Sequence, residues 1–384
     1  MQLFHFFDMD EQSYSHQLED LALLIPESKP KRPRYFGLDI LRIVACYMVM
    51  QLHSGQFYYS GQFASVLPGK GPVLIGFFNS LFRSAVPLFV MTSGYLLLPM
   101  RNDILTFLRS RFTRVLFPFF FWCIIYSFYN YALKNITLKQ ALLNIPYIFI
   151  NYGCYVGHLW YIYMLIGIYL FIPILSPWCE QATIGQYIYF FSFWLLSGCI
   201  DYIHLLTPTV WGECAWNGIS MLYNFNGYTG YAIFGAFVKI HLNQEEKYNL
   251  YLPAAVMVII GYLLTVFIFE YKLSHSPIHA FDLEMGWRFI NSNVIIMSCG
   301  LFLLLRKIQC KNSVLVKILQ DVSTKTYGMY LCHIIILNGL HELIDPKNEF
   351  HCAFSFVLSF CTFIASYFAI KFISFIPFSK YIIG

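Results

Sequence analysis

The chain has 384 residues, of which 58% are hydrophobic, 20% are aromatic and only 12% are charged. Soluble domains carry about 25% charged residues, and a soluble fold of this composition would expose more apolar surface than its core could bury. The composition therefore excludes an ordinary soluble protein and predicts an integral membrane protein. The net charge of +5 says little by itself, and no nucleic-acid partner is predicted.

Apolar runs of about 17 to 25 residues predict an all-α integral membrane protein with ten spanning helices. The sixth is the weakest, because it is short and rich in glycine. A further segment, 136–150, is amphipathic and is predicted to lie at the membrane interface or to dip into it. The ten predicted spans lie near 36–54, 72–99, 113–133, 158–176, 184–201, 226–241, 250–270, 288–305, 326–344 and 353–375.

The placement of Lys and Arg predicts the orientation of these spans. With the N-terminus in the cytosol, the cytosolic segments carry seventeen Lys and Arg and the opposite segments carry six. Both termini are therefore expected to be cytosolic. Residues 1–34 are expected to form a polar cytosolic extension whose basic end meets anionic lipid, and 35–384 to form one polytopic membrane domain. Eleven cysteines without a CxxC pair predict neither a disulfide scaffold nor a metal site.

The first predicted span contains two ionisable residues, Arg42 and His53. Such groups are costly in lipid and point to functional sites. They are eleven residues apart, so at about 100° per residue they differ by only about 20° around the helix and by roughly 16 Å along it. A stripe carrying both residues could line a passage between the two membrane faces. The alternative is an Arg42 paired with Asp39 one turn earlier and a His53 bonded to a carbonyl at the helix end.

The second predicted span carries Arg83 near its middle, where an arginine needs a partner or water. Pro87, Ser93 and Gly94 follow, and such residues loosen a spanning helix and let another backbone come close. Helix packing accounts for the small residues, but it does not account for an arginine inside a predicted span.

Arg111 and Arg114 lie at the start of the third predicted span. They are three residues apart and therefore share one helical face. Two guanidinium forks at this position suit a phosphate-rich ligand arriving from the cytosol. The alternative is ordinary positive-inside anchoring against lipid phosphates, and on these two residues alone it is the better explanation.

Two further groups are of interest on the opposite side. His158 and Trp160 open the fourth predicted span, and Tyr330 and His333 stand one turn apart in the ninth, where they could face a shared cavity. Each of the four would otherwise be structural, as interfacial aromatic anchors and satisfied histidines commonly are. The loops 202–225 and 271–287 hold tryptophan, carboxylate and amide side chains of the kinds that bind sugars.

These motifs occur in a familiar order. The ordered set resembles the acyltransferase 3 family of membrane acyltransferases, especially its surface-polysaccharide O-acetyltransferase branch, over about residues 35–380. The matching motifs are Leu-Asp-x-Leu-Arg42 followed by His53 after ten intervening residues, Val-Pro-Leu-Phe-x-Met-x-Ser93-Gly-Tyr, Arg111-x-x-Arg114, His158-Leu-Trp160-Tyr and Tyr-x-x-Tyr330-Leu-x-His333.

The resemblance implies an enzyme of the bacterial cytoplasmic membrane that takes an acyl group, usually acetyl, from cytosolic acyl-CoA as a co-substrate, with no bound cofactor. The acceptor would be a hydroxyl of a glycan or lipid-linked sugar. By motif, Arg42 and His53 match the family's essential pair, and Arg111 and Arg114 match its acyl-donor-binding pair. Arg83, Ser93, His158, Trp160, Tyr330 and His333 would support them.

Three other classes of protein compete with this interpretation. A glycolipid transporter or flippase would also use about ten spans, intramembrane arginines and aromatic outer loops. A glycan polymerase would lengthen chains without consuming acetyl-CoA. A non-enzymatic scaffold offers no reason for Arg42 and His53 on one stripe.

Overall fold

The computed structural model describes residues 34–61, 64–150, 157–242, 249–275, 279–345 and 351–384. Within these ranges the chain consists of helices and loops without a strand, which confirms the all-α fold class. Phe36–Gly384 forms one compact unit. Residues 1–33 of the predicted extension lie outside the described ranges, so that extension stays a prediction.

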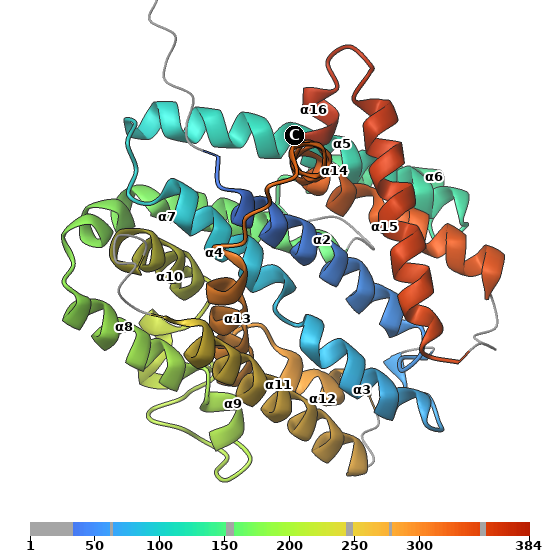
Figure 1. Cartoon of the computed structure of the whole chain (residues 1–384). Helices are drawn as coiled ribbons and strands as arrows, with labels where there is room; N and C mark the ends of the chain where they lie inside the picture. Colours follow the sequence, from blue (N-terminus) through green and yellow to red (C-terminus); the bar gives the residue numbers. More distant parts are fainter. Residues whose placement is uncertain (1–33, 62–63, 151–156, 243–248, 276–278, 346–350) are drawn as a thin grey trace, which may run out of the picture. The chain divides into compact units, whose positions relative to one another are not determined.

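Helices follow one another along almost the whole of this unit (Figure 1). Short 3₁₀ turns are η2 (Gly157–Leu159), η3 (Ser220–Phe225) and η5 (Glu284–Trp287), and η4 (Val238–Leu242) is a π-helical turn. The α-helices are α2 (Phe36–Gln56), α3 (Gly71–Phe82), α4 (Ala85–Leu97), α5 (Ile104–Ala132), α6 (Leu138–Tyr147), α7 (Trp160–Gln181), α8 (Ile184–Ser197), α9 (Ile200–Ile203), α10 (Thr229–Phe237), α11 (Tyr251–Ser274), α12 (Ala280–Leu283), α13 (Ser292–Leu305), α14 (Ser313–Ile344), α15 (Phe354–Ile373) and α16 (Lys380–Ile383).

Each of the ten predicted spans contains at least part of one of these helices. Among the described residues, six segments are long and apolar enough to cross a membrane, and a bent pair, Ala280–Trp287 with Ser292–Leu305 at 49°, would make a seventh. The protein is therefore a multi-pass membrane protein, while the number ten and the sides of the termini stay predictions. The six segments are Phe36–Gln56, Gly71–Leu97, Ile104–Ala132, Gly157–Gln181, Tyr251–Ser274 and Phe354–Ile373.

Helix α2 lies in the middle of the bundle, where α4, α14 and α15 pack around it (Figure 1). Its polar residues bond to these neighbours: Gln51 donates to Ser355 Oγ at 3.1 Å, and Ser54 donates to the Ser355 carbonyl at 2.8 Å. Because lipid offers no competing hydrogen bonds, such contacts fix the rotation of α2 against its neighbours. That rotation decides which side chains of α2 face the interior.

Small residues bring α4 and α10 into close contact. A Cβ on Gly94 would lie 2.1 Å from the Ala232 carbonyl oxygen, and one on Gly235 would lie 2.1 Å from the Met91 carbonyl oxygen. Neither site has room for a side chain, since real Cβ atoms do not approach so closely. The loose, small-residue character predicted after Arg83 is thus explained by helix packing.

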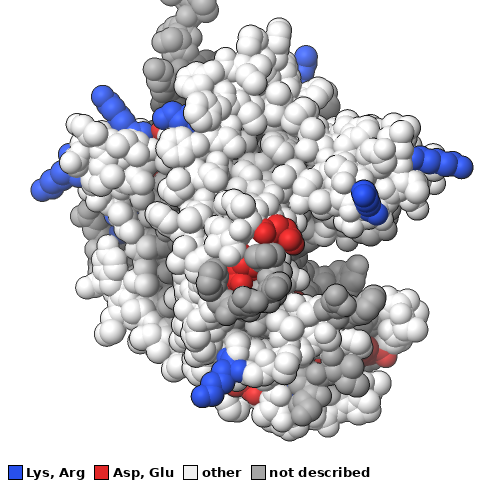
Figure 2. Space-filling model, turned by 90° about the vertical axis from the view of Figure 1, so that its right-hand side faces the viewer, with Lys and Arg blue, Asp and Glu red and all other residues white. Residues whose placement is uncertain are grey.

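Large apolar side chains cover the outer surface of several helices. Phe267 on α11 is 66% exposed and Phe372 on α15 is 69% exposed. The face in Figure 2 is mostly uncharged, with Lys and Arg at its margins. Lipid is the natural surrounding for such a surface. Helix α6 buries Ala141 and Asn144 and exposes Leu142 and Leu143; its predicted amphipathic character and its place at the membrane interface stay predictions.

Candidate functional site

A break in the second predicted span places Arg83 in the interior. Arg83 ends α3 and Ser84 precedes α4, so the span Gly71–Leu97 is not one continuous helix. Pro87 explains the position of the break. A proline lacks the N–H that would bond to the carbonyl four residues earlier, and its ring clashes with that carbonyl, which here belongs to Arg83.

Three side chains surround the Arg83 guanidinium. Its carbon lies 3.9 Å from the centroid of the Trp287 ring, and the guanidinium interacts with the nearby Tyr59 hydroxyl. That hydroxyl in turn donates to Glu284 Oε1 at 2.5 Å. Burial raises the pKa of Tyr59, so its hydroxyl keeps its proton and remains a donor. Trp287 itself is fixed by an indole hydrogen bond to Ser80 Oγ at 2.8 Å.

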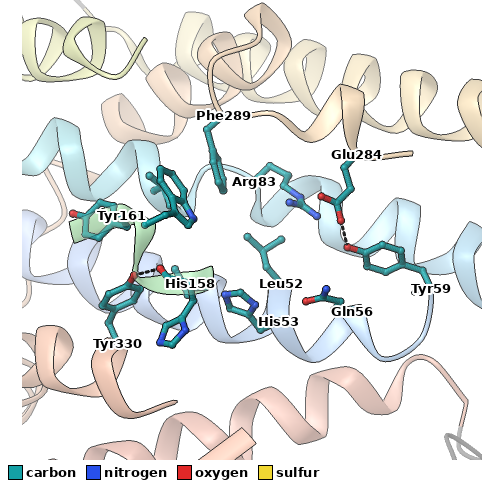
Figure 3. A pocket seen from close by; sticks show the side chains of 13 residues that line it. Leu52, His53, Gln56, Tyr59, Arg83, His158, Tyr161, Glu284, Phe289 and Tyr330 are labelled. Carbon is teal, nitrogen blue, oxygen red and sulfur yellow. Dashed lines mark hydrogen bonds between the residues drawn. The ribbon is translucent and has the colours of Figure 1, made fainter. Parts of the chain in front are cut away.

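Arg83 lines a cavity of about 240 Å³ that we call the inner cavity (Figure 3). In that view Arg83 lies on one side, and His53, His158 and Tyr330 lie on the other. Residues from α2, the α3–α4 break, η2, α7, η5 and α14 meet here. The lining residues are Val49, Leu52, His53, Gln56, Tyr59, Arg83, Val86, His158, Trp160, Tyr161, Glu284, Phe289 and Tyr330.

A second cavity of about 320 Å³, the outer cavity, lies against the same part of α2. Its remaining lining residues are uncharged and come from the end of α2, the following loop and α14. His53 and Gln56 belong to both cavities, and the Gln56 side chain interacts with the His53 ring. His53 therefore stands where two reactants held in separate cavities would meet. The lining residues are His53, Gln56, Phe57, Ser60, Gly61, Ile334, Leu337 and Asn338.

Three imidazole rings cluster beside the inner cavity. The centroid of His53 lies 6.3 Å from that of His158 and 5.3 Å from that of His333, and the last two are also 5.3 Å apart. His333 Nδ1 lies 2.5 Å from the Tyr330 carbonyl oxygen. A carbonyl can only accept, so Nδ1 carries the proton and Nε2 of a neutral His333 is a lone-pair acceptor.

The neighbours of this cluster fix its orientation. The Tyr330 hydroxyl donates to the His158 carbonyl, which ties α14 to η2. Nε2 of His158 and Nε2 of His333 are buried, and neither has a hydrogen-bond partner among the described residues. The described residues contain no group of three His, Cys, Asp or Glu side chains arranged to hold a metal ion.

Arginines gather around Tyr169 of α7, in a region that we call the arginine cluster. Arg42, Arg111 and Arg114 all lie within electrostatic range of its hydroxyl, which hydrogen-bonds Ser93. Arg114 is exposed and Arg111 is half-buried. Guanidinium groups from α2 and α5 thus lie near one tyrosine, an arrangement that suits phosphate groups.

Arg42 belongs to this cluster and does not line the inner cavity. It pairs with Asp39 at 3.8 Å, and its side chain is 36% exposed. The ion pair considered as the alternative is therefore present, together with the contact to the cluster. Arg42 also lies within electrostatic range of Tyr161, which lines the inner cavity about two helical turns from Tyr169. Tyr161 and Tyr169 on α7 thus connect the two regions.

The structure brings the predicted residues together in two groups. His53, Arg83, His158, Trp160 and Tyr330 line the inner cavity, with His333 directly beside them. The second group lies near Tyr169 and contains the remaining predicted residues, Arg42, Ser93, Arg111 and Arg114.

Sequence reasoning missed several lining residues. Gln56 follows His53 by three residues and so shares its helical face, which was a usable signal. The sequence contained no signal for Tyr59 or Asn338, because a single tyrosine beyond a helix and a single amide on a long helix are common. Glu284 was included only as a carboxylate of an outer loop, without its place beside Tyr59.

Comparison with known proteins agrees with the ordered motifs. The acyltransferase 3 model, described as an acyltransferase domain, matches residues 35–376. No curated protein and no solved structure matches the chain. The matched range covers α2 through α15 and so includes both cavities and the arginine cluster. The chain belongs to the acyltransferase 3 family and is a membrane acyltransferase.

Proposed function

We infer that this protein transfers an acetyl group from cytosolic acetyl-CoA to a hydroxyl of a surface polysaccharide or lipid-linked sugar at a bacterial cytoplasmic membrane. The observation that carries this proposal is the position of His53 between two cavities. An acyl transfer between two bound substrates needs a base at the point where they meet. No resident cofactor is required, because the thioester supplies the activated acyl group.

The donor is assigned to the arginine cluster and the inner cavity. Arg111 and Arg114 would bind the phosphates of CoA, and Arg42 would hold the donor where it passes Tyr169. The pantetheine arm would continue past Tyr161 and place the thioester in the inner cavity. Trp160 and Phe289, whose rings stack with centroids 6.0 Å apart, would enclose a short acyl group there.

The acceptor is assigned to the outer cavity. Its described lining has no charged side chain, and Ser60, Gln56 and Asn338 offer hydroxyl and amide groups. Such a lining suits the neutral hydroxyl groups of a sugar, since a charged acceptor group would lack a partner there. His53 would then face both the attacking hydroxyl and the thioester.

In the proposed step, His53 accepts the proton of the acceptor hydroxyl while the oxygen bonds to the thioester carbon. The carbon–sulfur bond then breaks, and the thiolate takes the proton from His53. The products are an O-acetyl ester and free CoA. A neutral imidazole can accept the first proton, and the imidazolium so formed can return it to the thiolate. Direct transfer is favoured over an acyl-enzyme relay because the two cavities allow both substrates to be present at once.

The test uses the full-length protein in proteoliposomes with labelled acetyl-CoA and polyprenyl-linked oligosaccharides. Wild type should add acetyl groups to the oligosaccharide, detected by mass spectrometry. His53→Ala should lower the rate by about 10²–10⁴, the usual contribution of a general base. The matched control is His275→Ala, because His275 is exposed at the end of α11.

Two outcomes would contradict the proposal. Full activity of His53→Ala would remove His53 from the chemistry. Movement of the oligosaccharide across the bilayer without any acetyl incorporation by wild type would instead indicate a flippase.

A further inference from the structure

Arg83 is a charge in a membrane-spanning segment that the proposed chemistry has not yet used. Arg83 is 9% exposed, and no described carboxylate forms an ion pair with it. A buried arginine is costly unless it is paired or has a function. Nε of Arg83 is buried and has no hydrogen-bond partner among the described residues. The packing around Arg83 therefore holds the guanidinium in place without a direct ion pair among the described residues, and Glu284 acts on it only from beyond salt-bridge distance.

The nearest carboxylate is engaged elsewhere. Glu284 accepts the hydrogen bond of the Tyr59 hydroxyl, and that hydroxyl lies between Glu284 and Arg83. The face of the guanidinium is covered by Trp287, which limits its movement to the plane of the ring. The result is a positive charge of fixed orientation at the wall of the cavity that His53 also lines.

We propose that Arg83 is a catalytic residue that stabilises the negative charge formed on the thioester oxygen during acyl transfer. The proposal rests on the acyl transfer inferred above. As the acceptor oxygen bonds to the thioester carbon and His53 takes the proton, the carbonyl electrons move onto the carbonyl oxygen. Arg83 faces this oxyanion. When the carbonyl re-forms, the carbon–sulfur bond breaks and the thiolate recovers the proton from His53.

The surroundings of the two candidate arginines distinguish them for this role. Arg42 is 36% exposed, is paired with Asp39 and does not itself line the inner cavity, so water and a carboxylate weaken its field. Arg83 is buried among aromatic rings, where a fixed charge acts on its neighbours more strongly than in water. His53 lies within electrostatic range of Arg83. The oxyanion would form between these two groups.

Tyr59 is assigned a positioning role. Its hydroxyl interacts with Arg83 and donates to Glu284, so it lies between the guanidinium and the carboxylate and keeps them apart. Without that hydroxyl, Arg83 would lose an acceptor and could turn toward Glu284. The charge would then be partly neutralised, and catalysis would weaken without loss of substrate binding.

The experiment measures kcat and KM in the same proteoliposome assay. Arg83→Gln should lower kcat by about 10²–10³, the cost of removing one oxyanion-stabilising group, with KM for acetyl-CoA within about threefold. Arg83→Ala should recover part of its kcat when guanidinium chloride is added, whereas equal ionic strength from sodium chloride should not restore it. Arg288→Ala is the matched control, because Arg288 is exposed and paired with Asp201.

Tyr59→Phe provides a second, milder variant. It should lower kcat about tenfold, the effect of one lost hydrogen bond, with an unchanged KM. Unchanged kcat in Arg83→Gln, or in Tyr59→Phe where the Arg83 variants do not accumulate, would overturn the role of Arg83. A loss confined to KM would also overturn it. If wild type transfers no acetyl group, the proposed function itself fails, and the role of Arg83 fails with it.

Discussion

The inner cavity and the arginine cluster both present guanidinium groups, yet their surroundings differ. Arg83 is buried, stacked on Trp287 and oriented by Tyr59. Arg114 is exposed, and Arg42 forms an ion pair with Asp39. A charge exposed to water attracts a phosphate but polarises little, whereas a buried and fixed charge acts on a developing anion. The same residue type is therefore suited to binding in one region and to chemistry in the other.

This comparison predicts a kinetic separation. Changes in the arginine cluster should alter KM for the donor, because they remove binding that is the same in the ground and transition states. Changes in the inner cavity should alter kcat or the choice of acyl group. The following predictions test the separation, beginning with the largest effect.

Arg111→Ala and Arg114→Ala should each raise KM for acetyl-CoA about tenfold to hundredfold and leave kcat nearly unchanged. Each loses a charge-assisted hydrogen bond to phosphate that is worth about 1.5–3 kcal/mol. The measurement is initial rate against acetyl-CoA concentration. KM of the wild type should also rise with salt, and KM of the double variant should rise less.

Arg109→Ala is the matched control for these two variants. Arg109 is exposed on α5 and lies two residues before Arg111, on another face of the helix. It should leave KM within about twofold. A fall in kcat without a change in KM for Arg111→Ala would break the proposed division between binding and chemistry.

Trp160→Ala should change which acyl group is transferred. Trp160 and Phe289 form an aromatic wall of the inner cavity, and removal of the indole makes room for a longer chain. Two more buried methylene groups contribute about 1.6 kcal/mol, so kcat/KM for butyryl-CoA relative to acetyl-CoA should rise about fifteenfold.

Trp216→Ala controls for a general effect of tryptophan loss, since Trp216 is 86% exposed in an outer loop. It should leave the butyryl-to-acetyl ratio unchanged. If Trp160→Ala also leaves this ratio unchanged, the acyl group does not lie against Trp160, and the donor's place in the inner cavity must be reconsidered.

Asn338→Ala should have the smallest effect, and on the other substrate. Asn338 lines the outer cavity, and one neutral hydrogen bond contributes about 0.5–1.5 kcal/mol. KM for the oligosaccharide should therefore rise about twofold to tenfold, while KM for acetyl-CoA stays constant. Asn102→Ala, in an exposed loop, should change neither. A rise in KM for acetyl-CoA alone would place the donor in the outer cavity.

The helices could be predicted from the length of the apolar runs, and the ordered motifs could be predicted from the types of residue in the sequence. Helical periodicity also placed Arg42 and His53 on one stripe, but their separate roles depend on other helices. The neighbours of Arg42 come from α5 and α7, and those of His53 from η2 and α14. Helical periodicity gives the relative positions of residues within one helix, so it does not predict which residues of other helices lie beside them.

The surroundings of Arg83 show the same limit. Pro87 was visible as a residue that loosens the helix, yet the direction in which the break turns Arg83 depends on Trp287. That tryptophan lies in η5, about two hundred residues later in the chain, within a segment predicted only as a sugar-binding loop. Tyr59 had no sequence signal at all, because its importance comes from its place beside Arg83 and its hydrogen bond to Glu284.

Pro87, which interrupts the second predicted span, also determines where the charge of Arg83 lies around the helix axis. Each residue added or removed between Arg83 and Pro87 would shift the two by about 100° around the axis and 1.5 Å along it. The guanidinium would then leave the Trp287 ring and turn toward lipid or toward packed backbone. The number of residues between Arg83 and Pro87 therefore matters, and deletion of one residue in this interval should lower kcat at least as much as loss of the arginine.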